Sequence, residues 1–462
     1  MSNQVLDRLR ARRAAMGLIL AAGLALTTLP TVARGEDTVD LGEPLSLEDV
    51  IRLAVERNLG YQQRLLTIDS AEGNLLSSRA QLMPNIRSSL GYTRNVSNSA
   101  APRVVDGNLV GGVENKTDVS VQSSLQLSGG LPLLDPSAWQ SVKASSRSLD
   151  ATKADVDRGR QSLAYTMTQQ YFELVRAKQL TEVSVQAYQL SQEQLQRAQA
   201  LYDLGSVARS DVLQAQVNLA SADRDRISAL TGVEQQRARL AVAIGAPVDA
   251  PVDVDEPGPL PSSPTSYDEP ALIGEAMDSR PDIRAAEFGL DAAKHSLSAS
   301  KWNRWPTLNA SASWRKSGDG PSDVFDKLNR EINYGAGLSL DWTLFDGLNT
   351  KGSIERSQAE LATRRRALEE AELQAALEVR EAHLAIQNAT ESIRSAEEGV
   401  RLAEESAKLQ QALYESGGGT LLEWNNAQVE LTRARVSLVQ AQVDLRLALA
   451  QLDLAVGRIG SR

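Results

Sequence analysis

Two stretches far apart in the chain share one pattern. AKHSLSASKWNRWP, residues 293–306, runs directly into the alternating stretch TLNASASWRK, residues 307–316. AEGNLLSSRAQLMP, residues 71–84, is followed in the same way by IRSSLGYTRN, residues 86–95. In both places a helical pattern ends at a proline and a strand-like pattern follows. The chain therefore repeats itself once and changes structural period at the same point in each copy.

The remainder of each half repeats as well. LGSVARSDVLQAQVNL, from Leu204, is echoed by SGGGTLLEWNNAQVEL, from Ser416, and Gly245 is echoed by Gly457. A period of about 210 residues exceeds the roughly 20–50 residues of solenoid units, so this is a duplicated domain. We expect a first repeat over residues 36–247, a Pro-rich linker over 248–270 and a second repeat over 271–462. The expected elements are strands at about 85–95 and 118–128 with a helical hairpin at 137–245, then strands at about 306–316 and 331–343 with a hairpin at 347–459.

The N-terminus has the pattern of an export signal. Four arginines within residues 8–13 precede an apolar run over 14–29, and small residues follow before Glu36. This predicts a signal peptide over residues 1–35, with an uncleaved anchor as the alternative. The chain has no cysteine, which excludes a disulfide framework and thiolate metal sites.

Composition and charge narrow the class of protein further. Only 4% of the 462 residues are aromatic against 42% hydrophobic, which suits long helices packed through small side chains. Five Arg and one Asp give residues 1–35 a net charge of +4, so the total of −10 leaves −14 on the remainder. A strongly acidic exported chain is a poor candidate for binding nucleic acid or anionic lipid headgroups.

The strand-like segments have the length and alternation of membrane strands. From Ile332 to Trp342, apolar side chains alternate with Asn, Gly, Ser and Asp without a break. Each run is close to the 9–11 residues that a tilted strand needs to cross a bilayer. Four strands cannot close a barrel, so membrane strands would require several chains to share one. A half-buried strand in a soluble sheet has the same period and remains the alternative. Residues 95–116 and 316–330 are expected to be exposed loops between strands.

The helical segments are unusually long. We expect a helix from Ser46 to about Met83, and Asp135 and Asp346 as N-caps of two helices without internal proline, over residues 137–203 and 348–415. Roughly 67 helical residues extend about 100 Å. One apolar line with 3-4 spacing follows the second long helix: Ile393, Ala396, Val400, Ala403, Ala407, Gln410 and Tyr414. A second line on another face comprises Leu402, Leu409 and Leu413. Two apolar faces indicate a closed ring of helices, or a coiled-coil pair with some surface leucines.

Taken together, the repeat, the strands and the helix lengths resemble the TolC-type outer-membrane efflux proteins. The segments that carry the resemblance are LSLEDVIRLAVERN (45–58), LYDLGSVARSDVLQAQ (201–216), SRPDIRAA (279–286), LDWTLFDG (340–347) and LYESGGGTLLEWNNAQ (413–428). The resemblance implies a mixed, mostly α fold in which three protomers form a 12-stranded transmembrane β-barrel continuous with a long periplasmic α-helical barrel. It also implies an outer-membrane location, a periplasmic adaptor and an inner-membrane pump of RND or ABC type as partners, and neither cofactor nor catalysis.

The resemblance also assigns roles to residues near the hairpin tips. It implies adaptor contacts at Gly205, Ser206, Val207, Gly417, Gly418 and Gly419. It implies a pore constriction at Glu423 and Asn426, and a tip network that includes Asp211 and Tyr414. Gly419 stands where the family has an arginine, so the family's closed-state arrangement does not transfer directly.

Two other classes compete with this interpretation. A periplasmic coiled-coil scaffold or adaptor without a pore would explain the helices, the signal and the acidity, but not four alternating strands of bilayer length. A hydrolase is disfavoured, because the two histidines, His295 and His383, lie in helical stretches without a nucleophile elbow or an HExxH pattern. We therefore expect an outer-membrane channel that is not an enzyme.

Overall fold

The computed structural model describes residues 43–459 apart from 106–107, 257, 261–266 and 319–331. The signal peptide expected over residues 1–35 lies outside these residues. The described chain belongs to a single compact unit, so the two halves are not separate globular bodies. None of the helices among the described residues combines the length and apolarity required to cross a membrane.

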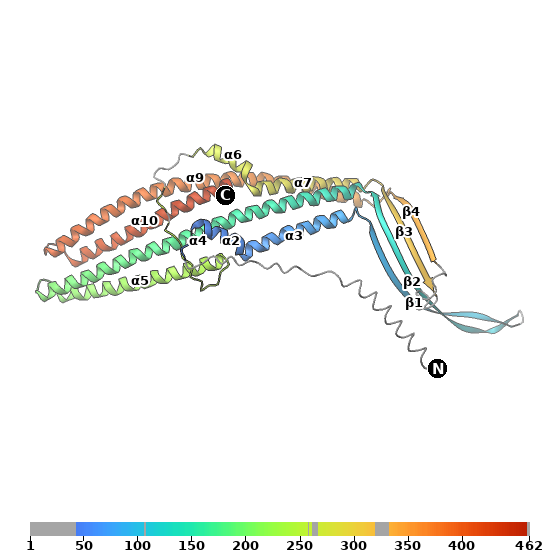
Figure 1. The fold of residues 1–462 in the computed structure, drawn as a ribbon, viewed down its shortest axis with the longest axis horizontal. Helices are drawn as coiled ribbons and strands as arrows, with labels where there is room; N and C mark the ends of the chain where they lie inside the picture. The colour runs from blue at the N-terminus through green and yellow to red at the C-terminus, as the bar shows by residue number, and fades with distance from the viewer. Residues whose placement is uncertain (1–42, 106–107, 257, 261–266, 319–331, 460–462) are drawn as a thin grey trace. The chain divides into compact units, whose positions relative to one another are not determined.

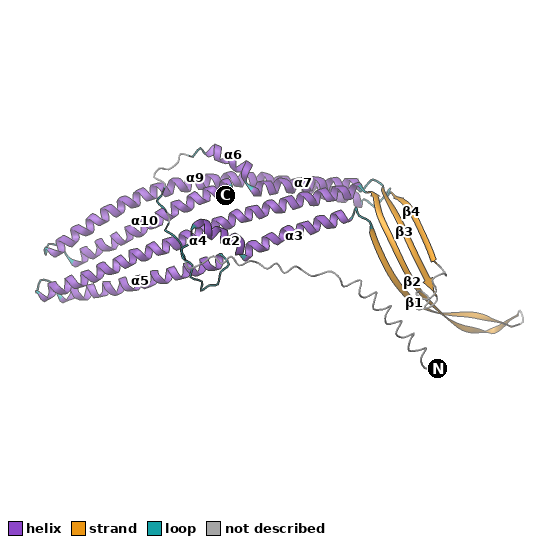
Figure 2. Ribbon diagram, viewed as in Figure 1, coloured by secondary structure: helices purple, strands orange, loops and turns teal. Residues whose placement is uncertain are grey.

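Four antiparallel strands form one sheet in the order β1-β2-β3-β4 (Figures 1 and 2). They are β1 (Asn85–Val105), β2 (Asn108–Leu134), β3 (Thr307–Gly318) and β4 (Ile332–Asp341). The expectation of a loop over residues 95–116 was wrong, because β1 and β2 keep pairing through it with one register shift between Pro102 and Arg103. A bulge at that point accommodates a proline, which cannot donate a ladder hydrogen bond. Most of the second expected loop lies outside the described residues.

The register places apolar side chains in rows on one face of the sheet. Leu127 pairs with Trp314, which pairs with Tyr334 on the next strand. Leu131, Ala310 and Leu338 form a parallel row. Alternate positions are small or polar, as where Ser311 pairs with Gly337. Tyr334 and Leu338 are largely exposed, so this apolar face is uncovered in the single chain.

Two very long helices run on from the strands. They are α4 (Pro136–Asp203) and α9 (Asn349–Glu415). Asp135 caps α4 as expected, since its carboxylate accepts a hydrogen bond from the Ala138 amide at 2.9 Å. Asp346 is not the N-cap of α9, which is Leu348 in a left-handed conformation. The Asp346 carboxylate instead reaches the Thr350 amide at 2.7 Å, so it still satisfies a free N–H of the first turn.

The single helix expected from Ser46 to Met83 is two helices, α2 (Leu47–Arg57) and α3 (Leu59–Ala80). Asn58 separates them in an extended conformation and caps α3 by accepting a hydrogen bond from the Tyr61 amide at 2.9 Å. An asparagine side chain competes well for backbone donors, so it favours a cap over a helix interior. The second half has the same break, between α6 (Glu269–Ser279) and α7 (Pro281–Trp302).

Each long helix forms an antiparallel hairpin with a shorter one (Figure 1). Helix α4 pairs with α5 (Arg209–Ala243), and α9 pairs with α10 (Leu421–Val456). Towards the strands, α4 packs against α3 and α7, and α7 packs against α9. Small side chains allow close approach in the hairpins, as where Ala198 meets Ala215 and Ala407 meets Ala427. Leu402 and Leu409 of the second apolar line stay exposed.

The expected linker over residues 248–270 is partly folded onto the helices. Val252 and Val254 are buried, and Val254 forms an isolated parallel bridge with Leu45. Asp253 accepts hydrogen bonds from Lys178 of α4 at 3.1 Å and from Arg237 of α5 at 3.3 Å. Helix α6 already begins at Glu269. The Pro-rich composition therefore marks a break in the helices and not a free tether.

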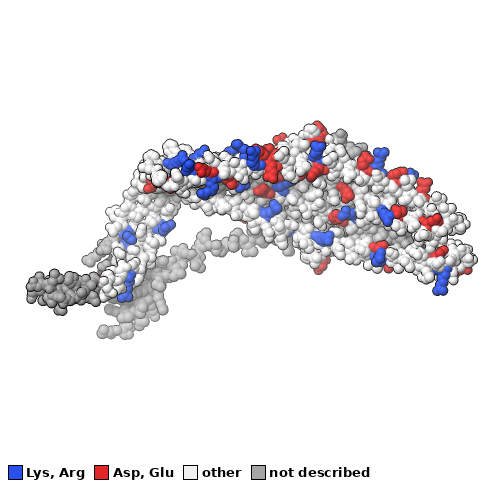
Figure 3. Space-filling view, turned by 180° about the vertical axis from the view of Figure 1, so that it is seen from behind, with Lys and Arg blue, Asp and Glu red and all other residues white. Residues whose placement is uncertain are grey.

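Charged residues are distributed unevenly over the described surface. On the face drawn in Figure 3, acidic and basic side chains are mixed along the helices, whereas the sheet is almost uncharged and carries a few basic side chains. Mixed charges are typical of solvated helix surfaces, and an uncharged sheet with an exposed apolar face is not typical of a soluble one.

Candidate functional site

The hairpin tips, where the resemblance places its functional residues, are two similar turns. Helix α4 ends before Gly205 and helix α9 before Gly417, both with positive φ angles of 72° and 78°. The Ser206 amide donates to the Leu201 carbonyl and the Gly418 amide to the Leu413 carbonyl, each at 2.9 Å. Glycine in the left-handed region closes a helix in this way without the strain that a side chain would add.

The two tips pack against each other. Tyr414, Leu421 and Trp424 form a buried cluster in the second hairpin, and Leu201 and Val207 of the first hairpin pack against it. The other expected adaptor-contacting residues at the turns, Gly205, Ser206, Gly417 and Gly418, are exposed, and Gly419 is partly covered. The tips thus present backbone and small side chains outward and hold each other through aromatic and aliphatic side chains.

The expected tip network is only partly assembled. The Tyr414 hydroxyl is buried and has no hydrogen-bond partner among the described residues, and neither has the Trp424 indole N–H. The two rings lie 5.3 Å apart between centroids. Burial raises the pKa of Tyr414, and the charge of Asp211 raises that pKa further. Asp211 is therefore close enough to act on Tyr414 electrostatically, although no hydrogen bond joins them.

Sequence reasoning missed the polar contacts that join the two hairpins beside this cluster. Arg197 of α4 pairs with Glu415 of α9, and its guanidinium carbon lies 5.9 Å from the centre of the Trp424 ring. Gln194, one turn earlier on α4, donates to the Asn425 side chain. Gln194 and Arg197 are three residues apart and so lie on one face of α4. This spacing is the sequence signal that could have indicated that both contact the same neighbouring element, here the second hairpin.

Glu423 and Asn426 are both exposed and lie one turn apart on α10. Glu423 forms a capping box with Thr420: its carboxylate accepts from the Thr420 amide at 2.9 Å, and the Thr420 hydroxyl accepts from the Glu423 amide at 3.2 Å. Hydrogen bonds from the Thr420 backbone and side chain lower the pKa of Glu423, which keeps it ionised. Its charge thus has a local structural role in addition to any role in a pore.

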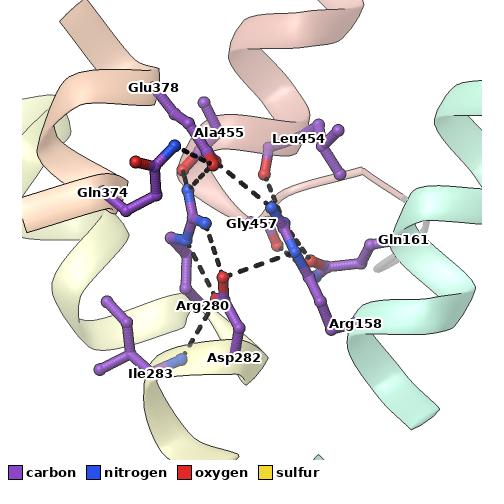
Figure 4. Close-up of polar contacts among 10 residues, drawn as sticks. All are labelled: Arg158, Gln161, Arg280, Asp282, Ile283, Gln374, Glu378, Leu454, Ala455 and Gly457. Carbon is purple, nitrogen blue, oxygen red and sulfur yellow. Dashed lines mark hydrogen bonds and ion pairs between the residues drawn. The ribbon is translucent and has the colours of Figure 1, made fainter. Parts of the chain in front are cut away.

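A second polar cluster caps the C-terminus of α10 (Figure 4). Side chains from α4, from the last residue of α6 and from Arg280, between α6 and α7, donate to four successive carbonyls: Arg158 to Leu454 at 3.0 Å, Arg280 to Ala455 at 3.1 Å, Ser279 to Val456, and Gln161 to Gly457 at 2.9 Å. The last carbonyls of a helix lack partners further along it, and cations suit this end of its dipole. Among the four, the Leu454 carbonyl also accepts a hydrogen bond from the Gly457 amide at 3.2 Å. The SRPDIRAA segment provides Ser279 and Arg280.

The guanidinium groups of this cluster are neutralised by two carboxylates. Arg280, only 1% exposed, makes two hydrogen bonds to Asp282, at 2.6 and 3.0 Å, and one to Glu378 of α9 at 2.7 Å. Arg158 of α4 lies 3.4 Å from Glu378 and 3.7 Å from Asp282. Burial acts to raise the pKa of Asp282, but hydrogen bonds from Arg280 and the charge of Arg158 outweigh it and hold that pKa below its usual value. The cluster therefore joins α4, α7, α9 and α10.

Neither histidine is placed in a reactive arrangement. His295 Nδ1 lies 2.9 Å from the Gln140 side chain, and His383 Nε2 lies 2.9 Å from that of Gln387. The described residues contain no group of three or more His, Asp or Glu that could hold a metal ion.

The family model for "Outer membrane efflux protein" matches residues 50–246 and 272–458, most of the chain, and the chain belongs to that family. The two matched stretches correspond closely to the two halves of the fold. The chain is also 26% identical to protein CyaE of Bordetella pertussis over 258 residues, 53% of each chain. It is 21% identical to the outer membrane protein TolC of Vibrio cholerae over 348 residues, 74% of this chain and 72% of that one. The matched regions span about half the length of the first two curated relatives, 53% and 47%.

Solved structures show the same fold. The outer-membrane channel OprN superposes with a TM-score of 0.74 at 21% identity, over 89% of both chains. The outer membrane protein VceC of Vibrio cholerae superposes with a TM-score of 0.72 at 20% identity, over 89% of this chain and 96% of that one. At these identities the likeness establishes the fold, namely a mostly helical chain with a small antiparallel sheet.

Proposed function

We propose that this chain is the outer-membrane channel component of a tripartite efflux or secretion system. It acts as a passive duct, a homotrimer in which each protomer adds four strands to one 12-stranded barrel and its helices to one periplasmic tunnel. A periplasmic adaptor would contact the hairpin tips, and an inner-membrane pump of RND or ABC type would supply the energy.

The observation that carries this proposal is the exposed apolar face of the sheet. Tyr334, Leu338 and Leu340 of β4 and Ile86 and Leu90 of β1 are all largely exposed, on strands at the two edges of the sheet. A soluble chain rarely leaves such a surface and two sheet edges uncovered. Lipid would cover the apolar face, and strands of neighbouring copies would pair with the two sheet edges.

The helices support the same assembly. Leu402 and Leu409 on α9, and Leu213 and Val217 on α5, are exposed leucine and valine side chains at helical spacing. They lie on surfaces that the chain's own helices leave uncovered, as a ring of helices from several copies requires. A scaffold or adaptor without a pore, the alternative function, would explain these helices but not the apolar sheet.

The tips are proposed to narrow the inner end of the duct. Glu423 and Asn426 would face the pore, and Asp211 and Tyr414 would belong to the contacts that hold the tips closed. Because Gly419 replaces the expected arginine, the contacts of Arg197 with Glu415 and Trp424 take over the cationic part of that arrangement.

Membrane fractionation and planar-bilayer recording test this function. We expect an SDS-resistant trimer in the outer-membrane fraction and a small, cation-preferring conductance. A soluble monomer recovered from the periplasm would favour the scaffold instead.

One substitution tests the pore constriction. Glu423→Gln removes the charge and keeps a side chain able to form the capping box, so it should raise conductance or weaken block by multivalent cations. Glu391→Gln, an exposed change on α9, is the matched control. Equal conductance and block in the two variants would leave Glu423 with its capping role alone.

A further inference from the structure

The junction between β4 and α9 exposes a dense group of large apolar side chains. Trp305 and Trp342 are each 60% exposed, and Leu344 and Phe345 are 81% and 80% exposed. Trp305 also packs on Trp302, with their ring centroids 5.3 Å apart. Aromatic side chains at this density on a surface mark a contact with a partner or a membrane interface.

Three members of this group, Trp342, Leu344 and Phe345, line a hollow that basic residues also line. A cavity of about 390 Å³ is lined by Arg304, Trp342, Leu344, Phe345 and Lys351, among others. The Trp342 indole N–H donates to the Arg304 carbonyl at 3.1 Å, which fixes one wall. Trp342 and Phe345 thus provide apolar walls, and two basic residues, Arg304 and Lys351, line the same hollow.

The two cations are available for a ligand. Arg304 is exposed, and its guanidinium has no ion-pair partner among the described residues. Among the described residues, Lys351 has one long ion-pair contact, with the exposed Glu355 at 3.8 Å. Asp346 also lines the hollow, but its carboxylate is engaged by the Thr350 amide and hydroxyl at the start of α9. One unpaired and one weakly paired basic side chain thus lie beside exposed aromatic side chains.

The corresponding junction of the first half is different. The residues 222 positions before Arg304 and 211 before Lys351 are Leu82 and Gln140, which are uncharged. Leu133 and Leu134 there are exposed, as Leu344 and Phe345 are in the second half. Both junctions are therefore apolar, but only the second combines this with two cations.

We propose that the hollow at the junction of β4 and α9 binds the phosphate headgroup of an anionic phospholipid. Arg304 and Lys351 would hold the phosphate, while Trp342, Leu344 and Phe345 would contact the glycerol and the upper acyl chains. The proposal rests on the channel function, which places this end of the strands at the inner leaflet of the outer membrane. The net negative charge of the chain disfavours anionic lipid as a general partner, and this site is a local exception, since fields of exposed charges are screened within about 10 Å.

Thermal stability of the purified trimer with added lipid tests the proposal. Phosphatidylglycerol should raise the melting temperature of the wild-type trimer more than phosphatidylcholine does, because a ligand that binds only the folded state stabilises it. In the double variant R304Q/K351Q the concentration of phosphatidylglycerol needed for half the shift should rise about 25-fold, since each basic side chain near an anionic surface contributes about fivefold. Phe345→Ala should raise this half-shift concentration less, and the variant should still respond more to phosphatidylglycerol than to phosphatidylcholine.

The controls separate the site from general charge and from free phosphate. The double variant R209Q/K408Q removes the same charge from exposed positions elsewhere on the helices and should respond to lipid as the wild type does. Inorganic phosphate alone should give no shift, and an equal shift with phosphate would overturn a lipid site. The proposal also fails if R304Q/K351Q and wild type respond alike. A conducting trimer without a phosphatidylglycerol effect overturns only this inference, whereas a chain that stays monomeric and outside the membrane overturns the channel function with it.

Discussion

The two halves of the chain cap the ends of their hairpins with different chemistry. In the first half, Asn58 follows α2 and its side-chain amide donates to the Ala243 carbonyl at 2.8 Å. In the second half, Arg280 follows α6 and its guanidinium donates to the Ala455 carbonyl at 3.1 Å. The two capping residues are 222 positions apart and the two carbonyls 212 apart. The same backbone group is therefore satisfied once by a neutral amide and once by a cation.

The change of one capping residue is matched by changes around it. The residue 211 positions before Glu378 is Met167, which is fully buried, and the residue 222 before Asp282 is Gly60. A buried guanidinium is tolerated only when it is paired and hydrogen-bonded, so the second half carries two carboxylates where the first half has a thioether and a glycine. The longer side chain also reaches α9, and Arg158 of α4 joins the same group. The comparison teaches that one backbone plan accepts either chemistry provided that each buried charge has its partner.

The largest effect is expected from the glycines at the two hairpin ends. A Cβ at Gly245 would lie 2.5 Å from the Arg57 carbonyl oxygen, whereas one at Gly457 would lie 3.1 Å from the Ser279 hydroxyl. Both residues have positive φ, 78° and 89°, which alone costs a side chain about 1–2 kcal/mol. Gly245→Ala should therefore lower the free energy of unfolding by about 3 kcal/mol or more, and Gly457→Ala by about half as much. Urea denaturation measures both losses. A larger loss of unfolding free energy for Gly457→Ala than for Gly245→Ala would contradict this prediction.

Breaking one charge pair in the second half should come next. Glu378→Met introduces the residue found in the first half and leaves the buried Arg280 with Asp282 alone, at a cost of about 2 kcal/mol. The double variant R280N/E378M removes both charges and should recover at least half of that loss. Glu372→Met, the same change at an exposed position of α9, controls for helix propensity. If the double variant were less stable than Glu378→Met, Arg280 would stabilise the fold through contacts other than its pairing with Glu378.

A smaller effect is expected at the neutral cap. Asn58→Ala removes the hydrogen bond to the Ala243 carbonyl and the cap on the Tyr61 amide, which together should cost about 1–2 kcal/mol in unfolding free energy. Asn58→Asp keeps the acceptor for the Tyr61 amide and loses only the donor to the Ala243 carbonyl. Its free energy of unfolding should therefore lie between those of the wild type and of Asn58→Ala. Equal stability of the alanine and aspartate variants would assign the whole effect to the contact with Ala243.

The smallest effect concerns acid. Because the pKa of Asp282 is held below its usual value in the folded chain, its ion pairs stabilise the fold at pH values above its unfolded pKa of about 4 and are lost as the pH falls below it. Melting temperature should therefore fall with acid more steeply in the wild type than in Asp282→Asn. The first half has an uncharged residue, Gly60, at the position that matches Asp282. The melting temperature of Asn58→Ala should therefore fall with acid as steeply as that of the wild type. Parallel pH profiles for wild type and Asp282→Asn would contradict this assignment.

Local patterns in the sequence were enough to predict much of the fold. Strand β4 is found at Ile332–Asp341 within the expected range, because strict alternation of apolar and polar residues is a local property. The long helices follow from stretches without proline bounded by Asp135 and by Gly205 or Gly417. The misjudged elements were those where one residue outweighed the pattern: Asn58 interrupts a helical period, and β1 and β2 pair through a stretch whose Gly and Asn content suggested a loop.

The candidate sites were less predictable for a physical reason. The turn glycines could be inferred from sequence, because a turn is local, whereas the pore role of Glu423 came from the family resemblance and stays a prediction. The partners of Arg197 could not, since Glu415 and Trp424 lie more than 200 residues away along the chain. The hollow at the junction likewise brings Arg304, which follows α7, and Lys351 of α9 to one lining, and these residues lie 47 positions apart along the chain.

By itself the sequence determined the duplication, the periods of its helices and strands, and the ends that a proline or a turn glycine marks, because these depend on neighbours within a few residues. Only the tertiary structure decided which buried charges meet, as Arg280 meets Glu378 across 98 positions, and which apolar faces stay uncovered. Both depend on packing between helices, where a side chain's surroundings are set by residues that periodicity does not identify. The charged cap of α10 is therefore invisible in SRPDIRAA until α4 and α9 are folded beside it.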